Sequence, residues 1–181
     1  MATNLFHIGS TAAVGNRRPG FGRMAYLARK SDFETMAAPS GTTGAASKTI
    51  TADHTFAAGK GFYQVWTKDN TLKADGASVG EPQAMQMSFK PEVQVMGDDA
   101  ALQAMMEELI AGDDYILLTQ APECGTDVYY QYGGACSPCI VTAVENTTGT
   151  FKEGSKSWKL TLETNQRFFY SGTITQATVT P

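Results

Sequence analysis

The sequence has no run of apolar residues near the roughly 20 that a membrane-spanning helix needs, and it carries little charge. Of its 181 residues, 18% are Asp, Glu, Lys or Arg, and the formal net charge is −4. Proteins that bind polyanions generically are normally basic, so this balance argues against that class. An apolar content of 42% together with the low net charge excludes wholesale disorder.

Histidine and cysteine, which carry much metal and nucleophilic chemistry, are scarce: the chain has two His and three Cys. Cys136 and Cys139 form a Cys-x-x-Cys pair, but structural zinc needs four ligands and His7 and His54 are far away in sequence. Aromatic and β-branched residues surround the pair, whereas a redox pair begins a helix after a strand. We predict ordinary thiols, with a disulfide from Cys124 to Cys139 or to Cys136 as an alternative.

Motifs that indicate an enzyme are also missing. The glycine-rich segment 15–22 lacks the strand–glycines–lysine–helix order of a phosphate-binding loop. Acids occur in pairs at 98–99, 107–108 and 113–114, without the alternating spacing of a calcium loop. We therefore predict no catalytic residue, no metal and no cofactor.

The amino terminus does not have the pattern of a secretion signal. Its first basic residue, Arg17, follows small residues instead of preceding an apolar block, so the chain is expected to stay in the cytoplasm, where thiols are reduced. Residues 1–22 show no periodicity and are predicted to form an extended arm. Residues 23–181 suffice for one β-rich domain, with a flexible loop of small residues at 37–47.

Charge is distributed unevenly along the chain. Residues 1–60 have a balance of +4 and residues 61–181 one of −8, and no basic residue lies between Lys90 and Lys152. The acids of that interval form either a solvated face or a surface that repels phosphate or contacts the basic segment of a neighbouring copy. Candidate basic contact residues are Arg17, Arg18 and Arg23. Candidate acidic residues are Glu92, Asp98, Asp99, Glu107, Glu108, Asp113 and Asp114.

Strand patterns dominate the rest of the chain. From Met85 to Val95 apolar and polar residues alternate, which predicts a long strand with one buried face. Pro91 lacks the N–H of a ladder bond, so it marks an edge or a bulge. We expect turns at Asp75-Gly76 and a hairpin at Gly133-Gly134. Further strands are predicted at 23–29, 49–51, 61–67, 114–119, 127–132, 139–144 and 157–163, with one or two at 168–180.

One helix is predicted, at about 98–112. Asp98 or Asp99 can cap its start, and Gly112 suits the position after its end. The apolar stripe consists of Leu102, Met105, Met106, Leu109 and Ile110. Roughly eight or nine strands and this one helix together predict a mainly β fold: a β-sandwich or small barrel with one helix packed across it.

Several short segments occur in a characteristic order beyond residue 20. They are Gly20-Phe21-Gly22-Arg23-Met24-Ala25-Tyr26-Leu27, Gly59-Lys60-Gly61-Phe62-Tyr63-Gln64-Val65-Trp66, the strand and helix over 85–112, Asp114-Tyr115-Ile116-Leu117-Leu118, residues 148–154 and Tyr170-Ser171-Gly172. In this order they resemble the tail-tube (major tail) proteins of long-tailed bacteriophages. The Cys-x-x-Cys segment is not part of this pattern.

The resemblance implies two packed β-sheets with a helix at the side, six copies in a ring, and stacked rings forming a tube. Its partners would be further copies and other tail proteins. DNA would pass through without specific binding, there would be no membrane insertion, and the location would be the virion tail, assembled in the host bacterial cytoplasm. The acidic interval would then face the lumen or a neighbouring subunit, and the basic arm would contact an adjacent ring.

Three alternatives stay open. The chain could be another virion part, such as a capsid decoration protein, a head–tail connector or a tail terminator. It could be the tube of a contractile injection system, which shares the tube-ring fold. It could also be an enzyme that uses Cys124, Cys136 and Cys139 to hold a metal.

Overall fold

The computed structural model describes residues 24–68, 71–120, 128–147 and 156–178. This part contains twelve strands and one α-helix, so the predicted mainly β fold with a single helix is confirmed. The longer strands are β1 (Met24–Arg29), β5 (Tyr63–Trp66), β6 (Lys73–Val79), β7 (Gln86–Met96), β8 (Tyr115–Gln120), β9 (Tyr129–Tyr132), β10 (Ile140–Thr147), β11 (Ser157–Glu163) and β12 (Arg167–Tyr170). The short ones are β2 (Phe33–Thr35), β3 (Thr49–Ile50) and β4 (Thr55–Phe56).

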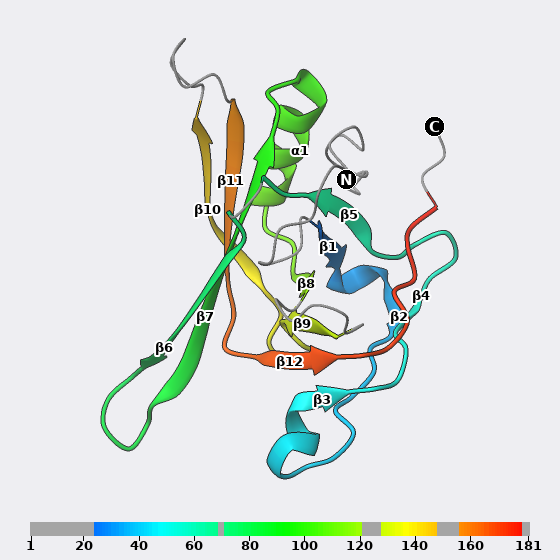
Figure 1. The fold of residues 1–181 in the computed structure, drawn as a ribbon, viewed down its shortest axis with the longest axis vertical. Helices are drawn as coiled ribbons and strands as arrows, with labels where there is room; N and C mark the ends of the chain where they lie inside the picture. Colours follow the sequence, from blue (N-terminus) through cyan, green and yellow to red (C-terminus); the bar gives the residue numbers. More distant parts are fainter. Residues whose placement is uncertain (1–23, 69–70, 121–127, 148–155, 179–181) are drawn as a thin grey trace.

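The strands form three sheets. A six-stranded sheet has the order β3-β12-β9-β8-β1-β5, a four-stranded sheet the order β10-β11-β7-β6, and β2 pairs with β4. In Figure 1 the long strands of the four-stranded sheet stand at the left, and helix α1 and the six-stranded sheet lie to their right. The chain is therefore layered, with the helix beside the four-stranded sheet as the apolar stripe predicts.

The six-stranded sheet is buried on both faces. In β1, Leu27 contacts the core shared with the four-stranded sheet, whereas Tyr26 belongs to a second core on the far face. In β8, Leu117 belongs to the shared core and Leu118 to the second core. Because side chains of a strand alternate between faces, a strand buried on both sides reads as a continuous apolar run. That accounts for the run of apolar residues in β8.

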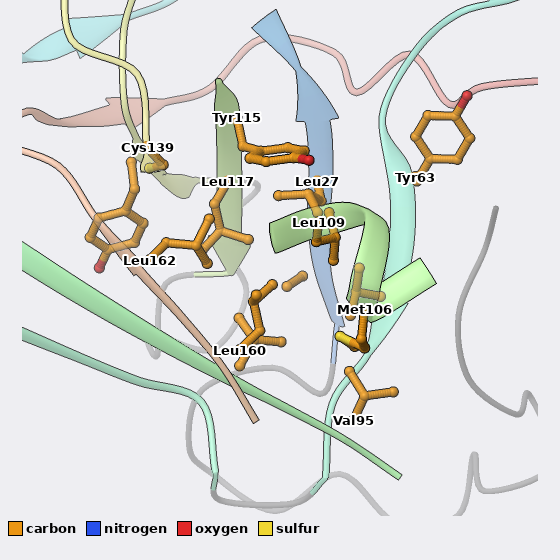
Figure 2. Close-up of a cluster of buried hydrophobic side chains, with 14 of the residues drawn as sticks. Leu27, Tyr63, Val95, Met106, Leu109, Tyr115, Leu117, Cys139, Leu160 and Leu162 are labelled. Atoms are coloured by element: carbon orange, nitrogen blue, oxygen red, sulfur yellow. The ribbon is translucent and has the colours of Figure 1, made fainter. Parts of the chain in front are cut away.

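Helix α1 spans Ala100–Ile110, slightly less than predicted. The side chain of Asp99 accepts a hydrogen bond from the Leu102 N–H at 2.7 Å, which identifies it as the N-cap. Gly112 has φ +101°, the left-handed conformation expected just past a helix end. Four residues of the predicted stripe are buried in the core between the two larger sheets, and Figure 2 shows Met106 and Leu109 among them. Ile110 is the exception, at 59% exposed.

Strand β7 differs from prediction in two ways. Its apolar positions are buried only from Phe89 to Val95. The β6–β7 hairpin extends past the six-stranded sheet, which leaves Met85 and Met87 exposed. Pro91 does not lie at an edge, since β7 pairs with strands on both sides. The backbone pairing of β7 with β11 is instead interrupted at Pro91. It ends at Glu92, and the next residue of β7 that is bridged on this side is Phe89.

Two predicted turns are wrong. Gly133-Gly134 does not close a hairpin, because β9 and β10 belong to different sheets and the chain crosses between them here. Gly133 has φ +88°, and a Cβ at this position would lie 2.9 Å from the Cys139 nitrogen. Asp75-Gly76 lies inside β6. The turn comes later, where the Ala84 N–H donates to the Glu81 carbonyl at 2.9 Å.

The predicted loop at 37–47 contains the start of a 3-10 helix, Gly44–Lys48, and otherwise has no regular structure. Its flexibility stays a prediction. The predicted arm at 1–22 lies outside the described residues.

Neighbouring residues of α1 allow a matched test of the core. Leu109 is fully buried and Ile110 is 59% exposed, so Leu109→Ala should lower the free energy of unfolding by about 2–5 kcal/mol. Ile110→Ala should change it by less than about 0.5 kcal/mol. Urea unfolding followed by tryptophan fluorescence measures both. Equal losses would contradict the packing of the helix.

Candidate functional surface

One face of the four-stranded sheet packs on the core, and no described residue lies over the other face (Figure 1). Alternation along the strands sends apolar side chains such as Val93 and Leu160 inward and polar ones such as Glu92 and Lys159 outward. We call this outer side the polar sheet face. Its charged residues are Lys73, Asp75, Lys90, Glu92, Glu145, Lys159 and Glu163.

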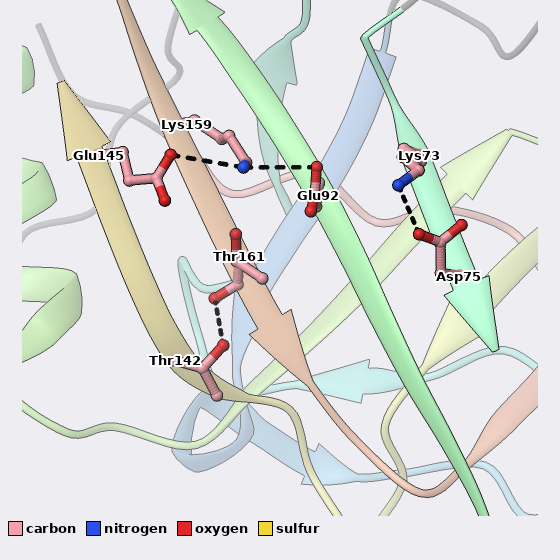
Figure 3. Close-up of polar contacts among 7 residues, drawn as sticks. All are labelled: Lys73, Asp75, Glu92, Thr142, Glu145, Lys159 and Thr161. Atoms are coloured by element: carbon pink, nitrogen blue, oxygen red, sulfur yellow. Dashed lines mark hydrogen bonds and ion pairs between the residues drawn. The ribbon is translucent and has the colours of Figure 1, made fainter. Parts of the chain in front are cut away.

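Every lysine of the polar sheet face is paired with a carboxylate. Lys159 Nζ lies 3.4 Å from Glu145 Oε2 and 3.6 Å from Glu92 Oε2, so it bridges β10 and β7 (Figure 3). At the edge, a hydrogen bond from Lys73 to Asp75 raises the pKa of Lys73. Both lysines are therefore paired, Lys159 across strands and Lys73 within β6.

The third lysine of the face is paired in the same way. Lys90 Nζ lies 3.4 Å from Glu163 Oε2, and Ser88 Oγ donates to the other oxygen of that carboxylate at 2.9 Å. Three lysines and four acids give the polar sheet face a formal charge of −1. A phosphate group approaching it therefore meets no cation that is free of a carboxylate partner.

Uncharged polar side chains of this sheet also form hydrogen bonds between strands. Gln94 Nε2 donates to Ser157 Oγ at 2.7 Å across β7 and β11. Thr142 sits at a bulge in β10, and its Oγ1 donates to the Thr161 carbonyl at 3.3 Å (Figure 3). The surface thus carries several small polar groups, most of which are held by contacts between neighbouring strands.

The two outer strands of this sheet, β6 and β10, have no partner on their outer sides among the described residues. Each therefore presents a row of backbone N–H and C=O groups, and neither contains proline. Neighbouring strands of the sheet are all antiparallel. With four alternating strands, β6 and β10 run in opposite directions.

The structure does not bring the seven predicted acidic residues together. Glu92 alone lies on the polar sheet face. Asp98 accepts from Asn146 at 3.2 Å and pairs with Lys156 at 3.2 Å, and these contacts, Asn146 first, hold the pKa of Asp98 below its ordinary value. Asp99 caps α1.

The other predicted acids surround the helix. Glu107 and Glu108 are exposed on α1, where Gln103 donates to Glu107 at 2.9 Å. After the helix, Asp113 Oδ2 lies 3.4 Å from Arg29 Nε, and Asp114 Oδ2 lies 3.6 Å from Lys30 Nζ. Basic residues from distant segments thus neutralise several of the acids that lie between Lys90 and Lys152, where the sequence has no basic residue. The pairing follows from the antiparallel contact of β1 with β8, which the sequence pattern did not predict.

The predicted basic contacts Arg17, Arg18 and Arg23 lie outside the described residues, as does Cys124. Cys136 is exposed and Cys139 is buried, and both are free. Burial raises the pKa of the Cys139 thiol. In the described ranges no three His, Cys, Asp or Glu side chains gather into a group that could hold a metal. Nor is any helix of these ranges long and apolar enough to cross a membrane.

Comparison with known proteins gives one weak likeness. No protein-family model matches the chain. No curated protein matches it either. Among solved structures, a chain of the "Virion of native gene transfer agent (GTA) particle" is similar over 60% of this chain and 88% of its own length, with 14% identity and a TM-score of 0.41. A likeness of this degree does not decide the function.

The two described cysteines should react very differently. In a Cys124→Ser variant, a thiol-specific chromogenic reagent should titrate one thiol in the native protein and two in denaturant, because Cys139 is buried with a raised pKa. A native count of zero that rises only after a chelator is added would instead indicate a metal at Cys136.

Proposed function

We propose that this chain is a structural virion protein that assembles into stacked rings of six copies each and forms the tail tube of a long-tailed bacteriophage. The observation that supports this most directly is the four-stranded sheet: among the described residues, its two edge strands have no outer partner and its polar face has no covering layer. Such a sheet suits lateral joining of copies around a channel through which DNA is delivered.

The strand directions support ring closure. Because β6 and β10 run in opposite directions, β6 of one copy can pair antiparallel with β10 of the next. The two copies contribute different surfaces to this contact, which is therefore head-to-tail. A head-to-tail contact generates a ring when the rotation from each copy to the next returns to the first copy. The helix and the six-stranded sheet occupy one side of the four-stranded sheet. That bulkier side fits outside the ring, which leaves the polar sheet face inside.

The chemistry of the polar sheet face suits a conduit for DNA. A lumen that held free lysines would bind phosphate and retard passage. Here Lys159 lies between Glu92 and Glu145, and the net charge is negative in every copy. In a ring these small negative charges repeat around the channel, so DNA is repelled weakly and bound nowhere.

Contacts between rings are proposed to use the amino-terminal arm and the 37–47 loop. Arg17, Arg18 and Arg23 would contact acidic residues of a neighbouring ring. Glu107 and Glu108 suit this role, since they are exposed and form no ion pair with a described residue. Other tail proteins would bind at the ends of the finished tube.

Electron microscopy of the purified protein over a concentration series tests the proposal. Stacked rings with a uniform bore are the expected result. Closed rings that never stack would indicate a head–tail connector or a tail terminator, and particles that stay monomeric at high concentration would indicate a decoration protein. Tubes enclosed by a sheath in the native particle would indicate a contractile system.

Blocking the β6 edge should stop assembly. The Phe89 N–H bonds to Thr164, so in the alternating ladder the Ser78 N–H points away from β7. Ser78→Pro removes that donor and places the pyrrolidine group of proline at the edge of β6, whereas Ser78→Ala keeps the donor. We expect only Ser78→Pro to remain monomeric in sedimentation velocity, with urea unfolding like that of the parent. Normal assembly of Ser78→Pro would exclude pairing through this edge.

Removing the acids around Lys159 should make the channel retain DNA. The double variant Glu92→Gln/Glu145→Gln changes the charge of the polar sheet face from −1 to +1 per copy. Glu34→Gln/Glu81→Gln is the matched control, because it removes two exposed charges that lie outside the polar sheet face. At low salt the assembled first variant should bind labelled duplex DNA at least about tenfold more tightly than the control, and the difference should vanish as salt rises. Equal affinities would place the polar sheet face away from the channel.

A further inference from the structure

The far face of the six-stranded sheet holds a histidine that the proposed function does not use. We propose that His54 is a proton-sensitive lock: in its neutral form it holds residues 36–39 against the six-stranded sheet, and on protonation it releases them. This inference does not depend on the tail-tube proposal.

Both ring nitrogens of His54 are engaged in a way that only the neutral ring allows. The side chain is 2% exposed. Nδ1 accepts a hydrogen bond from the Ala37 N–H at 3.0 Å, so it carries no proton. Nε2 lies 2.9 Å from Gln131 Oε1, and the Gln131 amide nitrogen donates to the Gly133 carbonyl at 3.1 Å. That second contact fixes the amide, so Nε2–H is the donor to Oε1.

These contacts connect separate parts of the chain. Ala37 follows β2, whereas Gln131 lies in β9, an interior strand of the six-stranded sheet. The imidazole stacks on Tyr170 of β12, with ring centroids 4.7 Å apart and 3° between planes, and meets the edge of Phe33 at 5.3 Å. His54 therefore fastens the segment after β2 to the middle of the sheet. Met36 and Ala37 pack against the core that this segment covers.

Apart from the face of the Tyr170 ring, little around His54 can stabilise a positive charge. The aromatic rings of Phe33 and Phe62 and the amide of Gln131 carry no charge. The phenol of Tyr170 donates to the Thr173 carbonyl at 2.8 Å. Asp53 is the acidic neighbour, but it is exposed and accepts from the Thr173 N–H. Burial lowers the pKa of His54 below 6.5, and the Gln131 hydrogen bond and Asp53 oppose this only in part.

Protonation breaks the contact to Ala37 specifically. A second proton on the ring sits on Nδ1, where it faces the Ala37 N–H, so two donors meet with no acceptor between them. Turning the ring over does not help, because both nitrogens of the imidazolium are donors. The open form protonates with an ordinary pKa near 6.5, and the closed form does so only at lower pH. The closed form is therefore fully favoured above pH 6.5 and loses stability as the pH falls below it.

Hydrogen exchange of the full chain tests the lock. Peptides covering residues 36–39 should lose at least about tenfold in protection between pH 7.5 and pH 5, after correction for the intrinsic pH dependence of exchange. Peptides from β8 should keep theirs. His54→Asn keeps an acceptor close to the position of Nδ1 but does not titrate, so its protection at 36–39 should not change with pH. His7→Asn is the matched control and should behave like the parent.

Two results would overturn the proposal. One is constant protection of 36–39 in the parent, and the other is an equal loss of protection in His54→Asn. If His54→Asn does not fold, nitrogen chemical shifts of the parent decide instead. The lock requires a neutral ring with the proton on Nε2 at pH 7.5, and a shift of the Ala37 amide that follows the titration of His54. An Ala37 amide that does not respond to that titration would exclude it.

Discussion

Burial of the six-stranded sheet on both of its faces is the constraint on which the other features depend. Its inner face takes the four-stranded sheet and α1, and its far face takes the β2–β4 ribbon and the segments around it. With both faces occupied, this sheet has no broad surface to offer a partner. The four-stranded sheet is different, since only one of its faces is needed for the core. Among the described residues, the uncovered sheet face therefore belongs to the four-stranded sheet, together with the long edge strands β6 and β10.

The same layering explains why charge is neutralised within the chain. Antiparallel pairing of β1 with β8 brings Arg29 and Lys30 beside Asp113 and Asp114, although some 80 residues separate them in sequence. Pairing of β7, β11 and β10 does the same for Glu92, Lys159 and Glu145. Arg29 is buried, but the lysine contacts lie at more exposed sites, where each gains little because water screens it. Its effect is on recognition, since a paired lysine is a poor phosphate ligand.

Sequence patterns predicted local structure well where one period dominated. The stripe from Leu102 to Leu109 identified α1, and alternation from Phe89 to Val95 identified the core part of β7. They failed where tertiary context decides. Met85 continues the alternation, but no second sheet lies opposite it, and Gly133 marks a crossover that looks like a hairpin in sequence. The candidate surface was predicted only at Glu92, because its other members are brought together by strand register across 90 residues of chain.

The unpaired edges of β6 and β10 bear on how the chain avoids uncontrolled association. Proteins usually protect long edges with proline, bulges or inward charges, since an open edge is a template for any other strand. Here β10 has one bulge and β6 carries the Lys73–Asp75 pair, but both strands are seven or eight residues long. Joining β6 to β10 of another copy satisfies both edges at once, and closing the ring removes every edge of this kind. In the ring that we propose, the exposed edges that would be a hazard for the single chain become the contact that orders many copies, and the far face on which His54 lies is left undisturbed.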